Sequence, residues 1–211
     1  MDSRRAALLA LLLSGAACSQ TPDETAGRPE RTASRPDLFA CEGCEATTER
    51  SAETLGWRLR LAPADEPGER LALSGRVFQA DGETPAPGVV LYLHQTNAAG
   101  VYPSRSGATG WARRHGTLRG WLATDAAGRY RVDTVRPGPY PDADLPAHVH
   151  VFVKEPGRPP YYVDDVTFEG DPFLTPAYRA REERRGGSGI VRLARRPTGG
   201  WQGRRDIVLE R

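Results

Sequence analysis

Two histidines separated by one residue, His148 and His150, form the motif in this chain that most directly suggests chemistry. They lie in segment 147–153, whose residues alternate as in a half-buried β-strand. Because residues two apart in a strand point to the same face, both imidazoles would project together, while Val149 and Val151 face the other way. Two adjacent imidazoles are half of a metal site. A pair of exposed or hydrogen-bonded histidines is the alternative that this motif alone leaves open.

Two tyrosines precede the histidines, in segments that could hold a phenol in place. Tyr140 lies in the sequence RPGPYP, where prolines on both sides fix the backbone. Tyr102 closes the segment NAAGVY, just after a strand that is apolar enough to be buried on both faces. Taken alone, either residue could equally be an ordinary turn or loop aromatic.

The elements that would position these residues are short strands. Segments of strand-like pattern, separated by turn residues, predict strands at 71–78, 89–94, 129–134, 147–153, 189–193 and 206–209, and one short helix within 176–185. Gly and Pro, at 23 and 18 residues, disfavour a helical bundle. We therefore expect an all-β domain at 65–211, a β-sandwich of mostly antiparallel strands with long loops and at most one or two short helices.

The charge balance excludes one class of partner. Lys and Arg number 29 and Asp and Glu number 27, which gives a net charge of +2. That balance produces no field strong enough to hold a polyanion, so we expect no nucleic-acid partner.

Residues 1–18 have the pattern of an export signal. Arg4 and Arg5 precede the apolar run 6–13, which is too short to span a bilayer, and the small residues 14–17 lead to Cys18. This arrangement resembles a bacterial lipoprotein signal, with an ordinary secretory signal and twin-arginine routing as alternatives. We expect lipid attachment at Cys18, a periplasmic or cell-envelope location, membrane contact only through that lipid, and a disordered tether at 19–40.

Two further cysteines, Cys41 and Cys44, belong to a lead-in segment at 41–64. In an oxidising compartment such an even pair favours a tight disulfide. A thioredoxin-like redox motif, half of a zinc site or two free thiols are the alternatives, although neither a βαβ pattern nor a second CxxC accompanies the motif.

Three stretches occur in a specific order: QTNAAGVY at 95–102, RGWLATDAAGRY at 119–130, and PGPYP at 137–141 followed by PAHVH at 146–150. Together they resemble the intradiol ring-cleavage dioxygenases, the family of protocatechuate 3,4-dioxygenase and catechol 1,2-dioxygenase. The likeness covers residues 65–211 and is strongest within 71–153.

The resemblance implies a ferric iron held by Tyr102, Tyr140, His148 and His150. The residue types agree with that metal. A phenol, whose pKa is about 10, ionises at neutral pH only beside a strong Lewis acid, and two phenolates with two imidazoles form a hard, anionic ligand set. The implied function is a non-haem Fe(III) dioxygenase that uses O2 to cleave a catechol-type small molecule between its two hydroxylated carbons, with homo-oligomerisation left open. The alternative is a non-catalytic β-sandwich envelope lipoprotein that acts as a binding module.

One position departs from the family. Its well-known members carry an arginine two residues before the Ala of the Ala-His-x-His segment, where this chain has Leu145. Arg119 and Arg136 are the cations near enough in sequence to replace it. His94 stands where the family often has Trp, and we expect it to pack or to form a hydrogen bond.

Overall fold

The computed structural model describes residues 39–211, so the expected signal at 1–18, its Cys18 and residues 19–38 of the expected tether lie outside the described residues. The first sheet contains β1 (Arg58–Arg60), β2 (Arg70–Phe78), β5 (Arg129–Val135), β9 (Ala194–Arg195), β10 (Trp201–Arg204) and β11 (Ile207–Val208). The second contains β3 (Val90–Gln95), β4 (Arg119–Ala123), β6 (His148–Lys154), β7 (Tyr161–Phe168) and β8 (Ile190–Val191). The helical elements are the 3-10 helices η1 (Cys44–Glu49) and η2 (Ala52–Thr54) and the short helices α1 (Gly110–Arg114) and α2 (Pro176–Arg179).

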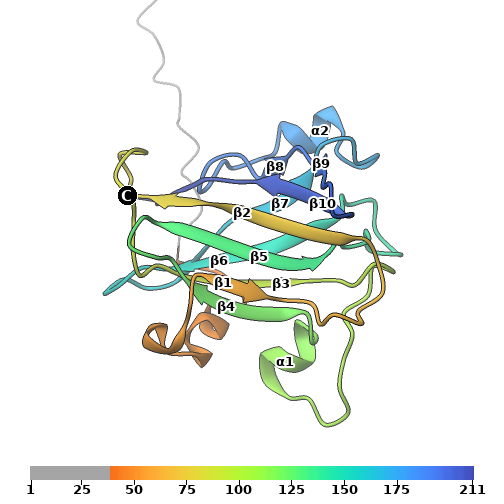
Figure 1. Ribbon diagram of the computed structural model, residues 1–211, viewed down its shortest axis with the longest axis horizontal. Coiled ribbons are helices and arrows are strands. Elements are labelled where there is room, and N and C mark those ends of the chain that lie inside the picture. Colours follow the sequence, from red (N-terminus) through yellow and green to blue (C-terminus); the bar gives the residue numbers. More distant parts are fainter. Residues whose placement is uncertain (1–38) are drawn as a thin grey trace, which may run out of the picture. The chain divides into compact units, whose positions relative to one another are not determined.

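The two sheets pack face to face as a sandwich (Figure 1). Strands follow the order β1-β5-β2-β10-β9 in the first sheet, where β11 also pairs with β2, and β4-β3-β6-β7-β8 in the second. The long pairings β2–β5, β3–β4, β3–β6 and β6–β7 are antiparallel, whereas the parallel pairings each involve one of the short strands. The predicted all-β sandwich is therefore confirmed.

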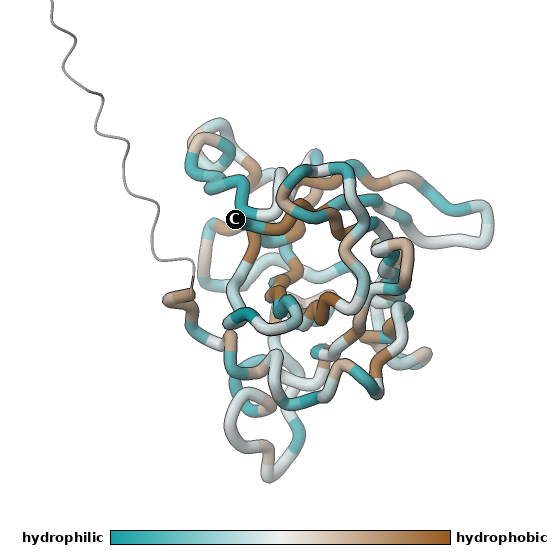
Figure 2. Tube along the Cα trace, turned by 90° about the vertical axis from the view of Figure 1, so that its left-hand side faces the viewer, coloured by the Kyte–Doolittle hydropathy of each residue, from teal (hydrophilic) through white to brown (hydrophobic). Residues whose placement is uncertain are grey.

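Alternation along the strands places the hydrophobic core between the sheets. Leu91 and Leu93 of β3 point inward beside Val149 and Val151 of β6, and all four side chains are buried in the same cluster. Figure 2 shows the hydrophobic segments gathered in the middle of the sandwich. Burial of each such side chain contributes about 1.5–3 kcal/mol relative to an exposed one, so these strands are held mainly by their inward face.

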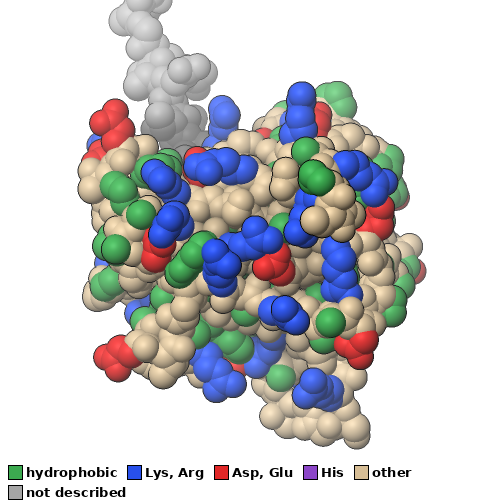
Figure 3. Space-filling view, in the orientation of Figure 1, with side chains coloured by type: hydrophobic (Ala, Val, Ile, Leu, Met, Phe, Trp, Pro, Cys, Tyr) green, Lys and Arg blue, Asp and Glu red, His purple; other side chains and the backbone are tan. Residues whose placement is uncertain are grey.

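The outer face of the second sheet is partly covered as well. There Tyr92 of β3 and Phe152 of β6 are buried against Cys44 and Ala46 of η1. Trp121 of β4 anchors this cover, because its Nε1 donates a hydrogen bond to the Ala46 carbonyl oxygen at 2.7 Å. The outer face of the first sheet is different: Figure 3 shows basic and acidic side chains spread over it and no histidine.

The six predicted strands all overlap strands of the structure, although those at 189–193 and 206–209 shorten to two residues each. The predicted short helix is α2. Strands β1, β4, β7, β9 and β10 were not predicted, and β1 pairs with β5 from within the lead-in segment 41–64. Within residues 39–211, no helix has the length and apolar character that spanning a bilayer requires.

Candidate metal centre

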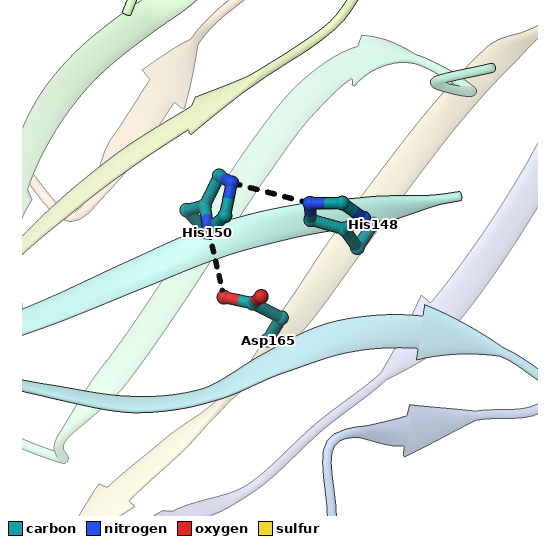
Figure 4. A group of neighbouring side chains, drawn as sticks. All are labelled: His148, His150 and Asp165. Carbon is teal, nitrogen blue, oxygen red and sulfur yellow. Dashed lines mark hydrogen bonds and ion pairs between the residues drawn. The ribbon is translucent and has the colours of Figure 1, made fainter. Parts of the chain in front are cut away.

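The outer face of the second sheet carries a row of aromatic and imidazole side chains. The antiparallel register of β3 and β6 sets His94 opposite His150, and Tyr92 opposite Phe152. His148 lies two residues before His150, on the same face, as its spacing predicted. The strand pairing therefore gathers the imidazoles on the face that looks away from the hydrophobic core (Figure 4).

Two loops bring the tyrosines to the histidines. Gly100, in the loop before Tyr102, is packed so closely on the segment before Tyr140 that a Cβ at Gly100 would lie 1.9 Å from the Pro139 carbonyl oxygen. Only glycine fits such a contact at a φ of +80°. Two hydrogen bonds tie the same loops together: Thr96 Oγ1 donates to the Gly138 carbonyl at 2.8 Å, and the Gly138 amide donates to the Asn97 carbonyl at 2.9 Å.

The four predicted ligands converge on one point. His148 Nε2 lies 3.2 Å from His150 Nε2, and Tyr140 Oη lies 3.3 Å from His150 Nε2. Tyr102 Oη lies 2.7 Å from Tyr140 Oη. Four side chains from one strand and two loops thus present two oxygens and two nitrogens to a common centre.

The outward nitrogens of both histidines are already engaged. His148 Nδ1 lies 2.7 Å from the Pro146 carbonyl oxygen, and His150 Nδ1 lies 3.0 Å from Asp165 Oδ1. A carbonyl oxygen and a carboxylate only accept hydrogen bonds, so each Nδ1 carries the proton and each Nε2 presents a lone pair. Burial lowers the pKa of His148, which favours this neutral form. The Tyr140 hydroxyl can donate a hydrogen bond to only one of the two Nε2 lone pairs, whereas a cation between the two imidazoles would bind both. The donor set therefore fits a metal ion.

Burial also raises the pKa of both tyrosines, Tyr102 most strongly. On their own these phenols therefore remain protonated. A bound cation reverses that preference, because its charge stabilises the phenolate. The arrangement suits a hard, highly charged metal better than zinc, which more often takes Cys, His or carboxylate ligands.

Asp165 is a site residue that the sequence did not reveal. Figure 4 shows it on the neighbouring strand, joined to the ring nitrogen of His150 that does not face His148, and the three residues form the group in residues 39–211 that could also hold a metal. Because Asp165 contacts Nδ1 rather than Nε2, it orients the imidazole instead of joining the four donors. Burial alone would raise the pKa of Asp165, but its interaction with His150 lowers that pKa overall.

His94 and His115 complete a cluster that contains all four histidines of the chain. His94 is stacked between His115, at a ring distance of 3.8 Å, and His150, at 4.3 Å. His94 is buried, and within residues 39–211 its Nδ1 has no hydrogen-bond partner. His94 thus packs between the two rings, one of the two arrangements expected for it. Burial lowers the pKa of His94 strongly and that of His115 to about 4.

Two cavities lie beside the four donors. One, of about 280 Å³, includes Tyr102 and His150 in its lining, and its other walls are Glu42, His94, Arg114, His115 and Phe152. The second, of about 260 Å³, is lined by Leu145 and Asp165 together with Tyr162, Asp164, Tyr178, Arg181, Glu182 and Glu183. Leu145 thus lines the same cavity as the residue that orients His150.

The two arginines considered as substitutes for the missing family arginine are engaged elsewhere. Arg119 forms an ion pair with Glu49 at 2.6 Å, and Arg136 lies over the rings of Phe168 and Trp201. Arg181 is the cation that lines the same cavity as Leu145.

The structure joins Cys41 and Cys44 as a disulfide, with Cα atoms 5.7 Å apart. The loop that it closes shares Cys44 with η1, and Cys44 packs against Tyr92 and Phe152 on the sheet face that carries the histidines.

The fold and the site define a β-sandwich protein with a two-tyrosine, two-histidine cluster suited to a hard metal ion. The chain belongs to the intradiol dioxygenase family: the family model described as "Dioxygenase" matches residues 48–183.

Individual relatives agree with this assignment. The chain is 30% identical to catechol 1,2-dioxygenase of Acinetobacter baylyi over 148 residues, which are 62% of this chain and 46% of the relative. It is 34% identical to the protocatechuate 3,4-dioxygenase beta chain of Burkholderia cepacia over 113 residues, which are 51% of this chain and 48% of the relative. The chain therefore spans about half the length of these curated relatives.

One solved structure matches over most of its length. It is the dioxygenase domain of a dioxygenase carbohydrate-binding protein fusion from Streptomyces sp. SirexAA-E, with a TM-score of 0.52 and 27% identity. The match covers 72% of this chain and 88% of that domain. Catechol 1,2-dioxygenase from Pseudomonas arvilla C-1 matches with a TM-score of 0.55 and 26% identity, over 73% of this chain and 56% of that one.

Proposed function

We propose that this protein is a non-haem Fe(III) dioxygenase that cleaves a catechol-type ring between its two hydroxylated carbons and incorporates both atoms of O2. The observation that carries the proposal is the convergence of Tyr102, Tyr140, His148 and His150, with both Nδ1 atoms turned outward. The names of the relatives, which are catechol and protocatechuate dioxygenases, support the substrate class.

The four donors would hold the iron. When bound, Fe(III) supplies the Lewis acidity and the template that draw a catechol and O2 together. Hydrogen bonds at the far nitrogen of each ring orient the two histidines: His148 Nδ1 donates to the Pro146 carbonyl oxygen, and His150 Nδ1 donates to Asp165 Oδ1. Such outer partners set the tautomer of a ligating histidine and raise its basicity.

The tyrosines can also move protons. A catechol must lose its hydroxyl protons as it binds, and a phenolate oxygen at Tyr102 or Tyr140 is a base within the site. Because the two Oη atoms lie 2.7 Å apart, a proton taken up by one can be shared with the other. A tyrosine that has taken up such a proton keeps it, because burial raises the pKa of both Tyr102 and Tyr140 and so favours the neutral phenol.

Iron content, colour and O2 uptake test the proposal together. We expect the purified full-length chain to bind about one iron per chain through these ligands, to be red or purple from tyrosinate-to-iron charge transfer, and to consume O2 with catechol while forming a muconate-type diacid. The double variant His148→Ala/His150→Ala is the matched control and should be colourless. A colourless wild-type protein that takes up no added iron supports the alternative, a binding module.

A further inference from the structure

The disulfide between Cys41 and Cys44 lies beside the candidate metal centre, although nothing in the four-donor set requires it. Cys44 is buried in a cluster with Tyr92 and Phe152 on the outer face of the second sheet. Tyr92 Oη in turn lies 2.7 Å from His115 Nδ1. The closed loop therefore rests on the rings that surround the histidines.

The backbone of the loop also approaches those rings closely. Gly43, inside the loop, has a φ of +91°, and a Cβ there would lie 2.9 Å from His115 Cε1 and 3.5 Å from Phe152 Cζ. A side chain would need to displace His115, so the close approach needs glycine. His115 and Phe152 both line the cavity of about 280 Å³ that opens on Tyr102 and His150.

The remaining residue of the loop, Glu42, lines that cavity directly. It forms an ion pair with Arg114 of α1, which lines the same cavity, and both side chains are exposed, at 68% and 59%. The segment after the loop is fastened to the sheet by the Trp121–Ala46 hydrogen bond and by the Glu49–Arg119 ion pair at 2.6 Å.

We propose that the disulfide-closed loop Cys41–Cys44 is a wall of the substrate cavity, and that Glu42 with Arg114 determines which catechols enter it. The inference rests on the proposed function. The disulfide keeps Gly43 against His115 before substrate arrives, so that binding does not have to order the loop. The paired charges at the mouth suit uncharged catechols, because neither an anionic nor a cationic substituent meets an uncompensated opposite charge.

Opening or displacing the loop should weaken binding without removing the metal. The variants are Cys41→Ser/Cys44→Ser and Gly43→Ala, and the control is Gly157→Ala. Gly157 has a φ of +72° with open space around it, beyond the end of β6 remote from His150, so this control has the same backbone strain without a contact at the site. The affinity for catechol is read from the change of the visible tyrosinate-to-iron band on titration of the iron-loaded chain, beside iron content and melting temperature.

We expect both loop variants to keep their iron and to bind catechol about 3- to 10-fold more weakly, as for the loss of one preordered segment. Gly157→Ala should bind catechol like the wild type even where its melting temperature falls. Reduction of the wild type with a phosphine should reproduce the effect of the double serine variant, and it replaces that variant should the latter fail to fold.

The charges at the mouth are tested with two substrates, catechol and 3,4-dihydroxybenzoate. Glu42→Gln leaves Arg114 unpaired, and we expect it to bind the carboxylated substrate about 2- to 5-fold more tightly, with catechol little changed. Arg114→Gln should weaken binding of the carboxylated substrate by a similar factor.

Two failures are distinguishable. A wild-type chain without iron or a visible band overturns the proposed function and this inference with it. A wild type that binds iron and catechol, with loop and charge variants of unchanged affinity, overturns this inference alone.

Discussion

His150 and Asp165 are joined across a β-bulge. Opposite His150, the register between β6 and β7 shifts, so that Asp164 and Asp165 occupy the space of a single residue between Val163 and Val166. The bulge turns the Asp165 carboxylate toward His150 Nδ1, at 3.0 Å. One irregularity of the sheet thus fixes the tautomer of a proposed metal ligand.

Asp165→Asn should weaken iron binding. The amide still fills the space, but it removes the negative charge that holds the Nδ1 proton, and loss of such an outer partner typically costs about 10- to 100-fold in metal affinity. Competition with a coloured chelator measures the change, and exposed Asp144→Asn, in the loop between Tyr140 and His148, is the matched control. Equal affinities of wild type and Asp165→Asn would show that the hydrogen bond does not tune the site.

Removing any proposed ligand should have a larger effect. Tyr140→Phe, His148→Ala and His150→Ala each delete one of four donor atoms, so we expect iron content to fall sharply in all three. Elemental analysis of the purified variants decides the matter. Unchanged iron in all three variants means that the metal is held elsewhere.

Leu145→Arg should raise kcat on catechol. Leu145 lines the cavity that includes Asp165 and not the one lined by Tyr102 and His150, so the longer arginine side chain has to reach across to the substrate ring. That ring gains negative charge during attack by O2, and one positioned donor is worth roughly 10²–10³ in rate. Leu145 is 39% exposed, so the new guanidinium keeps contact with solvent, and the acidic residues Asp164 and Glu182 of the same cavity offer it partners. The measurement is kcat of both forms on a small and a large catechol, since the longer side chain could exclude the larger substrate. Fast turnover of catechol by the wild type would mean that a different group, such as Arg181, already supplies the charge.

Acid should destabilise the metal-free protein partly through His115. Burial, followed by the charges of His150 and Arg119, lowers its pKa in the folded state to about 4, against about 6.5 when unfolded. Between these values the unfolded chain binds a proton that the folded protein does not, so the free energy of unfolding falls as pH falls from about 6.5 to about 4, by up to about 1.4 kcal/mol per pH unit. Denaturant unfolding across this range should show a shallower pH dependence for His115→Gln. Parallel curves for the two proteins would refute the assignment to His115.

Cys18→Ala should abolish lipid attachment and leave soluble or uncleaved protein. The prediction rests on the small residues 14–17 before Cys18 and on the basic and apolar segments ahead of them. Growth with labelled fatty acid, followed by isolation of the protein, provides the readout. Label in the Cys18→Ala protein would contradict lipidation at this residue.

Residue spacing was sufficient to predict strands in which apolar and polar residues alternate between the two faces. The alternation at 147–153 predicted β6 and put His148 and His150 on one side, because a strand has a period of two. Strand β7 was missed because Asp164 and Asp165 stand in the middle of YYVDDVTF and interrupt its pattern, and that interruption is the bulge itself. Strand β4 was missed because Gly120 breaks its run; a Cβ there would lie 2.9 Å from Leu59 Cδ1 of the facing sheet.

The candidate site was predictable only in part. Tyr102 and Tyr140 lie in loops, where periodicity carries no information, so their pairing with the histidines came from the family resemblance. His115 escaped notice because it ends the short helix α1, and only tertiary packing brings its ring onto His94. Leu145 was identified as a departure from the family, but the partners of Arg119 and Arg136 could be learned only from the structure.

The two faces of β6 have a consequence for how this protein can change over time. Val149, Val151 and Val153 pack into the core, while His148, His150 and Phe152 face the site. In a deep mutational scan, substitutions at the first set should reduce the abundance of the protein, and substitutions at the histidines should reduce turnover at normal abundance. Selection for a new substrate can therefore act on the residues of β6 that face the site, while the alternate residues that face the core continue to keep the domain folded.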